Sequence, residues 1–537
     1  MSWTAHLPIL PVLLPAATAV ALLALGDARR RASRSLSLSS TALGLLLALA
    51  LLRQADGGAL LVYRLGDWPA PFGIALVADR LSALMVLLTS AVALPVVLYA
   101  ATAGAPAWDA RGRHFHALFQ FQLMGLNGAF VTGDLFNLFV FFEVLLIASY
   151  VLMLHGLGRE RLRAGLHYVV LNLAASALFL LGLALVYAAA GTLNLADLAL
   201  RAPQVAGTDA RLLQAGALLL LVVFAFKAAL VPLSLWLPAT YSAAGAPVAA
   251  LFALMTKVGV YAIWRVHGVA FGAGADGASG ASGAHALAQP LLLPLALLSC
   301  LLGVAGAMAA RTLARLVAWL NVASVGTVLA GLGLHGAAAW GAALFYLPGS
   351  TLVVALLFLL ADVVGQRRGE AGDALEPVPA VRQPAWLGGL FLLGAVSIAG
   401  LPPLPGFLGK VLLLQAAAGH PAAAAVWAVL LLMGSGALIA LARAGSVLFW
   451  QAQEPPAPAR PSPPFPLPGA ALAAVLLLAA AGVALSVAAA PVQRYARAAA
   501  EQLVDVAGYA QAVLPQAGGA QPHSTRPYTG RVEGAQP

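Results

Sequence analysis

Charged residues are scarce in this chain, and lysine is almost missing. Only 9% of the 537 residues are charged, and the 29 basic side chains comprise 26 arginines and three lysines. Soluble globular proteins carry about 25% charged residues, so a soluble fold is excluded. With 62% hydrophobic residues and a mean hydropathy of +0.92, the composition is typical of an all-α polytopic membrane protein.

Cysteine and metal-binding patterns are scarce as well. The single cysteine, Cys300, excludes a disulfide or an all-cysteine iron–sulfur cluster within the chain. Only His114 and His116 have close histidine spacing, and they adjoin Arg111 and Arg113, which favours an interfacial role over metal binding. No nucleotide-binding loop, nucleophile triad or metal cluster is visible, so we expect no metal, no cofactor and no free-standing enzyme.

What the sequence does contain is a series of long apolar runs. A helix of about 20 apolar residues crosses a bilayer, so these runs predict transmembrane helices. The cluster DARRRASR follows the first run instead of preceding it, which indicates a retained helix and not a signal peptide. We expect about fourteen spans, near residues 8–25, 37–52, 77–101, 114–132, 134–154, 166–190, 213–241, 247–270, 288–309, 313–334, 340–364, 386–419, 422–450 and 467–490.

The arginines between these runs predict the orientation in the membrane. If the N-terminus is outside, fifteen arginines fall in inward loops, namely Arg29, Arg30, Arg31, Arg34, Arg111, Arg113, Arg159, Arg161, Arg163, Arg311, Arg315, Arg367, Arg368, Arg382 and Arg460. Only five fall in outward loops, namely Arg53, Arg64, Arg80, Arg201 and Arg211. Cytoplasmic loops carry the positive excess, so both termini are expected outside. The net charge of +10 is then a topology signal, and no nucleic-acid partner is expected.

All three lysines lie inside apolar runs. Lys227 is in VVFAFKAALV, Lys257 in ALFALMTKVGVYAI and Lys410 in PGFLGKVLLLQ. A lysine at the centre of a membrane helix costs about 2.5 to 3.5 kcal/mol, which indicates a use. Chance survival in an arginine-rich composition is the alternative, but it would scatter the lysines over loops. Because a buried ammonium can lose its proton and a guanidinium cannot, the pattern indicates proton transfer.

Two of the runs contain helix-breaking residues beside a lysine. The run 213–241 has Pro232 and Pro238 after Lys227, and the run 386–419 contains GLPPLPGFLGK, which ends at Lys410. Proline interrupts a helix, so we expect spans seven and twelve to be discontinuous. Kinks that serve only packing are the alternative. The coincidence with two lysines favours an ion path of the kind built from inverted repeats.

Acidic residues are rare within the apolar runs. Only Glu143 lies near the middle of a strongly apolar run, LFNLFVFFEVLLIASYVLML. An isolated buried carboxylate is costly, so we expect it to pair with a buried lysine, Lys227 or its equivalent, and to modulate that proton site. Asp134 is expected to cap this helix and Asp362 to lie at the membrane interface. Polar residues that could support water are Ser234, Thr256, His167 and Asn172.

Four stretches carry a family resemblance. The segments GAFVTGDLFNLFVFFEVLLIASYVLMLHG, RLRAGLHYVVLN, FAFKAALVPLSLWLPATYSAAGAPVAALFALMTKVGVYAIWRV and GLPPLPGFLGKVLLL resemble the D-type subunits of the Mrp-type (Mnh or Pha) multisubunit monovalent cation/proton antiporters. The resemblance extends from about residue 75 to 450. That family shares a fourteen-helix fold with the antiporter-like membrane subunits of respiratory complex I, which implies two inverted repeats with broken helices seven and twelve.

The resemblance implies a proton-translocating subunit in the bacterial inner membrane. Its proton residues would be Glu143, Lys227, Lys257 and Lys410, and its partners other antiporter subunits, protons, monovalent cations and lipid. The implied division is 1–110 for helices one to three, 111–270 and 288–450 for the first and second repeats, and 451–537 for the last helix, an amphipathic segment and a disordered tail.

One stretch departs from the family pattern. Related proteins often carry a histidine before Ser-Thr in span eleven, whereas this chain reads YLPGST, with Pro348 and Gly349 in that neighbourhood. A water chain near Ser350 and Thr351 would have to replace a histidine relay. Our hypothesis is that protons pass from Lys227 to Lys257 to Lys410 and that Na+ or another monovalent cation moves elsewhere in the complex.

Two other functions stay open. A proton-pumping membrane subunit of an NADH-quinone oxidoreductase is the first, although the stretch GDLFNLFVFFEVLLIASY favours the antiporter. The second is a scaffold that moves no ions. Near the C-terminus, PVQRYARAAAEQLVDVAGYAQAVL is amphipathic and could lie on the outer membrane surface, and the Gly/Gln/Pro-rich tail after residue 515 is expected to be disordered.

Overall fold

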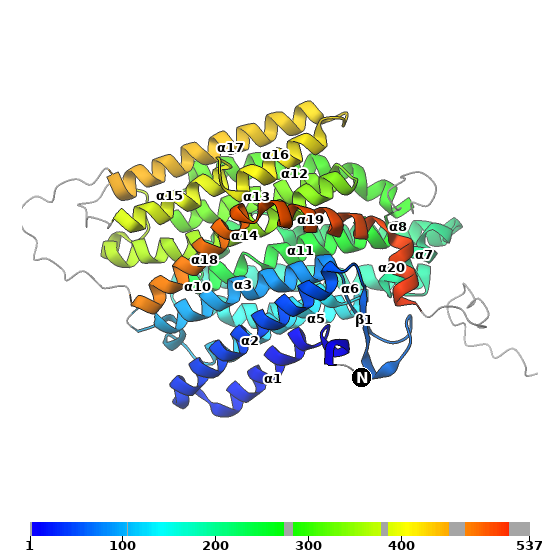
Figure 1. The fold of residues 1–537 in the computed structure, drawn as a ribbon, viewed down its shortest axis with the longest axis horizontal. Coiled ribbons are helices and arrows are strands. Elements are labelled where there is room, and N and C mark those ends of the chain that lie inside the picture. Colours follow the sequence, from blue (N-terminus) through cyan, green and yellow to red (C-terminus); the bar gives the residue numbers. More distant parts are fainter. Residues whose placement is uncertain (1–2, 105, 273–282, 377–384, 451–467, 515–537) are drawn as a thin grey trace, which may run out of the picture.

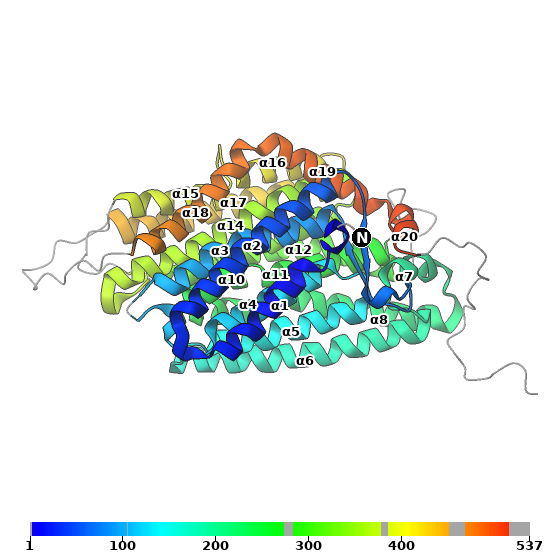
Figure 2. The same ribbon diagram turned by 60° about the horizontal axis from the view of Figure 1, so that its bottom comes forward.

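A computed structural model describes residues 3–104, 106–272, 283–376, 385–450 and 468–514. Long helices run side by side through the molecule, with the N-terminal helices along one edge and α15 to α17 along the opposite edge (Figure 1). Turning the molecule shows α5 and α6 forming a further edge below α1 and α4 (Figure 2). The predicted all-α class is therefore confirmed.

The helices follow the apolar runs of the sequence. Their bounds are α1 Leu10–Leu25, α2 Arg30–Asp56, α3 Arg80–Thr102, α4 Phe115–Val131, α5 Leu135–Leu154, α6 Arg159–Ala190, α7 Leu195–Arg201, α8 Gly207–Ala228, α9 Trp236–Ala243, α10 Ala246–Phe252, α11 Met255–Ile263, α12 Gly283–Ala309, α13 Leu313–Gly333, α14 Ala337–Arg368, α15 Ala385–Ala399, α16 Pro405–Ala417, α17 Ala423–Gly445, α18 Gly469–Val487, α19 Ala489–Val504 and α20 Val506–Val513. The π-helical turns η6 (Trp264–Ala270) and η8 (Ser446–Trp450) extend α11 and α17.

Membrane-spanning character is widespread in these helices. Among the described residues, eleven helices are long and apolar enough to cross a bilayer, and α1, α15 and α16 are shorter apolar helices. Each predicted span contains at least one helix. Helix α1 has only 16 residues, and the second break divides its span into α15 and α16. These three helices are therefore each shorter than a simple crossing. The count of fourteen crossings thus stays a prediction.

Both predicted helix breaks are confirmed. The first separates α8 from α9, and the second separates α15 from α16. Backbone groups released at the breaks find partners, as membrane depth requires. In the first break the Val231 amide donates to the Ser299 hydroxyl of α12 over 2.9 Å. In the second, the last carbonyls of α15 accept from Lys410, so a predicted proton residue also completes the broken backbone.

Residues 247–270 were predicted to form one span, and this prediction is confirmed, since Ala246–Ala270 is one apolar helical segment long enough to cross a bilayer. A turn at Ala253 and Leu254 separates α10 from α11, but both residues keep right-handed helical dihedral angles. Lys257 therefore lies within a continuous helical segment, whereas Lys227 and Lys410 adjoin true breaks.

The interior of the bundle is formed by α13 and α14 together with α10 and α11. The most apolar stretch of α14 is 100% buried, whereas that of α6 is only 39% buried. Side chains on the outer face of α6, including Leu166, Val170 and Leu173, are exposed. In a chain of this composition such a face contacts lipid, and the lysines on α11 and α16 lie away from it.

Several elements were not predicted. Strands β1 (Leu61–Arg64) and β2 (Ala75–Ala78) form an antiparallel hairpin, and α7 is a short helix. Asp134 caps α5 as predicted, since its carboxylate accepts from the Asn137 amide over 2.8 Å. Asp362, predicted at the interface, lies near the end of α14 and accepts from three side chains, those of Tyr99, Trp108 and Gln366.

The amphipathic C-terminal stretch differs from its prediction. It forms α19 and α20, and the apolar face of α19 packs on α14 and α3. The buried side chains of that face are Ala496, Ala499, Ala500 and Leu503. This face is therefore covered by the protein itself and is not free to enter a membrane surface. The tail predicted to be disordered lies outside the described residues.

Candidate functional site: three buried lysines

Lys227 occupies the last turn of α8, immediately before the first break. Its side chain is 5% exposed. The ammonium donates to the Asn172 side-chain oxygen over 3.0 Å and to the Asn172 backbone oxygen over 3.5 Å, both on α6. Its hydrogen-bond partners are thus neutral. Asn172, proposed from the sequence as a water-supporting residue, contacts the lysine directly.

Lys257 lies on α11 and is 0% exposed. Its ammonium donates to Asn321 Oδ1 over 2.9 Å and to Ser324 Oγ over 3.2 Å, both on α13, and lies 3.4 Å from Thr256 Oγ1. The expectation that Thr256 lies at this lysine is met. Asn321 and Ser324 were missed, although their spacing of three in LVAWLNVASVGTV places them one turn apart on one side of α13.

Lys410 lies on α16, after the second break, and is 6% exposed. It donates to the carbonyl oxygens of Ile398 and Ala399 over 3.2 and 2.8 Å. Gly400 has a left-handed φ of +84°, and a Cβ there would lie 2.8 Å from the ammonium nitrogen. A glycine at this position therefore leaves room for the lysine to cap the interrupted helix.

None of the ion pairs found within the described residues involves a lysine. The direct ion pair that we expected between Glu143 and Lys227 is therefore not formed in the described part of the chain. Glu143 is half-buried and accepts a short hydrogen bond from the Ser176 hydroxyl of α6. Ser176 lies one turn from Asn172, the partner of Lys227. The carboxylate and the ammonium thus contact adjacent turns on the same face of α6, without a direct ion pair between them.

Close packing brings together the two helices that carry Lys227 and Lys257. A Cβ at Gly259 on α11 would lie 2.3 Å from the Ala228 nitrogen and 2.7 Å from the Lys227 carbonyl carbon. The end of α8 therefore rests directly on α11, two residues from Lys257. No side chain larger than hydrogen fits there without moving the helix end that carries Lys227.

Replacing Gly259 with alanine should separate these helices and lower ion exchange. A displacement near 1 Å in a transfer site can cost about a hundredfold in rate, so a loss of about tenfold or more is expected. The measurement is exchange by the intact complex in vesicles, normalised to the amount assembled. Gly389→Ala is the matched control, because a Cβ at Gly389 would meet nothing within 4 Å. Equal activity of both variants would contradict the packing role.

Polar groups on α13 extend from Lys257 toward Lys410. Thr327 lies one turn beyond Ser324, and its hydroxyl is 3.4 Å from the Met433 sulfur of α17. A Cβ at the adjacent Gly434 would lie 3.8 Å from the Lys410 ammonium. The Cys300 sulfur of α12 is 3.7 Å from the Thr327 hydroxyl. Thr327 therefore lies between the residues that surround Lys257 and those that surround Lys410. This position was not predicted from the sequence.

The remaining predicted residues lie around this site. Ser234 is buried within the first break, whereas His167 is exposed on α6 and lines an outer groove with Trp236. The hydroxyls of Ser350 and Thr351 both donate to the Leu347 carbonyl of their own helix. Helix α14 continues through the YLPGST stretch, and the proposed water chain there stays a prediction.

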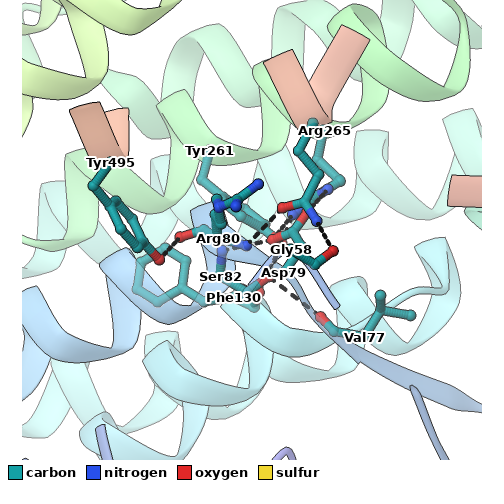
Figure 3. A network of polar contacts seen from close by, with 10 residues as sticks. Gly58, Val77, Asp79, Arg80, Ser82, Phe130, Tyr261, Arg265 and Tyr495 are labelled. Atoms are coloured by element: carbon teal, nitrogen blue, oxygen red, sulfur yellow. Dashed lines mark hydrogen bonds and ion pairs between the residues drawn. The ribbon is translucent and has the colours of Figure 1, made fainter. Parts of the chain in front are cut away.

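A buried ion pair was also missed. Arg265 in η6 donates to both carboxylate oxygens of Asp79 over 2.7 and 2.9 Å, and each residue is 2% exposed (Figure 3). Asp79 also caps α3 by accepting from the Ser82 amide over 2.8 Å. Tyr261, one turn before Arg265, donates to the Phe130 carbonyl over 2.7 Å. Lys257, Tyr261 and Arg265 follow at intervals of four, so the pair anchors the helix that carries Lys257.

Comparison with known proteins shows which family the chain is similar to. Residues 132–438 match the family described as NADH:quinone oxidoreductase/Mrp antiporter, TM. A relative from Rhizobium meliloti, named as a probable D-type subunit of a K(+)/H(+) antiporter, is 41% identical over 96% of this chain and 99% of its own length. The D-type subunit of an Na(+)/H(+) antiporter from Alkalihalophilus pseudofirmus is 37% identical over 85% of this chain and 88% of its own length.

Solved structures show the same fold. A chain of the Mrp complex from a Dietzia species superposes with a TM-score of 0.82 at 28% identity, covering 96% of this chain and all of that one. A chain of respiratory complex I from Thermus thermophilus superposes with a TM-score of 0.73 at 26% identity, covering 94% and 99%. This chain therefore belongs to the NADH:quinone oxidoreductase/Mrp antiporter family of membrane subunits.

Proposed function

We propose that this chain is the proton-translocating subunit of a multisubunit monovalent cation/proton antiporter, acting on Na+ or K+. Protons pass along Lys227, Lys257 and Lys410, Glu143 biases the first of them, and the cation moves elsewhere in the complex. The chain is a transporter subunit and not itself an enzyme. It lies in the bacterial inner membrane with both termini outside, and 111–270 and 288–450 are its two repeats.

One observation carries this proposal. Three buried lysines share one bundle, each is hydrogen-bonded only to neutral oxygens among the described residues, and close packing or α13 joins the helices that carry them. A lysine held in this way can release its proton without leaving an unpaired carboxylate in the membrane. A carboxylate paired with the lysine would stabilise the charged ammonium and so oppose release of its proton, just as Asp79 stabilises the charged guanidinium of Arg265.

A membrane subunit of an NADH-quinone oxidoreductase is the second candidate, supported by the likeness to the complex I chain. The antiporter is favoured because relatives named as D-type antiporter subunits match at up to 41% identity over nearly the whole chain, and the Mrp chain superposes with the higher TM-score. Both candidates use the same lysines and differ in what drives the protons.

The test is exchange in everted vesicles from cells that lack their own antiporters and express the complete complex. Adding Na+, K+ or Li+ should discharge an imposed pH gradient, and Lys227→Ala should reduce this exchange by about a hundredfold or more, as expected for loss of a proton-transfer group. Arg211→Ala is the matched control, an exposed positive charge on the same helix. Proton movement that needs NADH and no cation would favour the second candidate.

A further inference from the structure

A small polar cavity lies away from the lysines, at the end of the bundle where α2 begins. Its volume is about 30 Å³, which is room for about two water molecules. Polar and titratable side chains dominate its lining, namely Asp27, Arg30, Ser33, Asp109, His114 and His116. This part of the chain precedes residues 132–438, which match the family.

A histidine and a carboxylate lie together in the lining of the cavity. His116 on α4 is 7% exposed, and its Nε2 lies 3.0 Å from Asp109 Oδ2, while its Nδ1 has no hydrogen-bond partner within the described part of the chain. Asp109 also accepts two hydrogen bonds from Arg34. Burial would raise the pKa of the Asp109 carboxyl, but the hydrogen bonds from His116 and Arg34 hold it below its usual value.

Further buried polar groups follow His116 along α4 and α2. Gln120 is one turn beyond His116 on α4 and donates to the hydroxyls of Ser37 and Thr41 on α2 over 3.2 and 3.0 Å. Ser33, Ser37 and Thr41 follow at intervals of four, a length of about 12 Å along α2. Helices α1, α2 and α4 contact one another along this path (Figure 2).

Gln122 lies two residues from Gln120, on the side of α4 that faces away from α2. It is 0% exposed, and neither amide atom of its side chain has a hydrogen-bond partner among the residues described. It shares a face of α4 with Phe130, eight residues on, whose ring packs on Tyr261 of α11 at 5.2 Å. Helices α4 and α11 run parallel, since both end near Asp79. Gln122 therefore lies about one turn before the level of Lys257.

We propose that α1, α2 and α4 enclose a hydrated proton inlet, with His116 and Asp109 at its mouth and Gln120 and Thr41 along it. Gln122 is the step toward Lys257, a connection that rests on the proposed function. The inlet takes protons and not alkali cations, because Arg30 and Arg34 balance the carboxylates of Asp27 and Asp109 at the mouth, and the groups beyond it are neutral and offer no carboxylate to replace the hydration shell of a cation. The alternative is that these polar groups serve only to pack α1, α2 and α4 together, in which case no water would lie between the helices.

Cysteine labelling tests the inlet directly. The chain has one cysteine, the buried Cys300, so a Cys300→Ser background carries Thr41→Cys or Gln120→Cys in the full complex. A membrane-impermeant, negatively charged sulfonatoethyl methanethiosulfonate reagent, added from the side that carries Arg30, should modify both positions. Because only a hydrated thiolate reacts, labelling should be about tenfold faster than at Phe119→Cys, the equally buried neighbour on α4. Labelling no faster than this control would overturn the inlet.

Transport separates this inference from the proposed function. Gln120→Leu and Gln122→Leu should each lower cation/proton exchange about tenfold without loss of assembly, as for an interrupted proton path. Gln204→Leu, at an exposed position, is the control. If the positions label but these variants transport normally, the connection to Lys257 is overturned and the hydrated inlet stands. If Lys257→Met transports normally, the proposed function itself fails.

Discussion

Replacing Lys257 with methionine should abolish cation/proton exchange while the complex stays assembled. Methionine has a similar length and suits an apolar site, so packing on α13 is largely kept. The proton carrier is lost, however, and Asn321 and Ser324 cannot replace it because neither takes up a proton at neutral pH. Loss of a transfer group of this kind costs about a hundredfold or more in rate.

Lys257→Arg is the decisive companion variant. Arginine keeps the positive charge, and its guanidinium can still donate to Asn321 and Ser324, but it does not release a proton. If the site works by proton transfer, the arginine variant should be as inactive as the methionine variant. If the charge only orders the helices, the arginine variant should keep exchange. Both are measured as cation-induced discharge of a pH gradient in vesicles, normalised to the assembled complex.

Removing Arg265 should have the largest effect on stability. In Arg265→Ala the Asp79 carboxylate loses its two charge-assisted hydrogen bonds while it stays buried. Breaking one side of a buried pair typically costs about 3–5 kcal/mol, because the remaining charge has no partner. We expect little assembled subunit in membranes and a clearly lower unfolding temperature for the purified complex in detergent.

A double variant tests whether the pair itself is responsible. Asp79→Asn together with Arg265→Met removes both charges, so it should recover much of the stability that either single variant loses. The exposed Arg497–Glu501 pair on α19 is the control, since pairs of this kind contribute little. If the double variant loses as much as the sum of the two single variants, the pair is not the stabilising unit.

Individual residues show which features were predictable from the sequence. The breaks after Lys227 and before Lys410 were predictable, because proline cannot continue a helix in any surroundings. The continuous span that carries Lys257 was predictable as well, because its apolar run contains no proline between Val248 and Ala270. Arg265 was passed over inside an apolar run, because its partner Asp79 lies 186 residues away in the chain.

The partner of Glu143 shows the same limit. A lone carboxylate in an apolar run does need a partner, and it has one, but that partner is Ser176 and not a lysine. Charge and hydropathy establish that a group must be satisfied, whereas the direction in which α5 faces α6 decides which group does so. Hydroxyls and amides are common in membrane helices, so Asn321 and Ser324 carried too weak a signal to be selected in advance.

Composition and local pattern were thus sufficient for the membrane-spanning helical class, the two proline breaks and the three lysines, because burial cost, helix period and proline geometry act on short stretches of chain. The neutral partners of each lysine, the contact of Gly259 with the end of α8, the Asp79–Arg265 pair and the polar path beside α4 were decided by tertiary structure. Each depends on which helix faces join residues far apart in sequence, and no local preference specifies that choice.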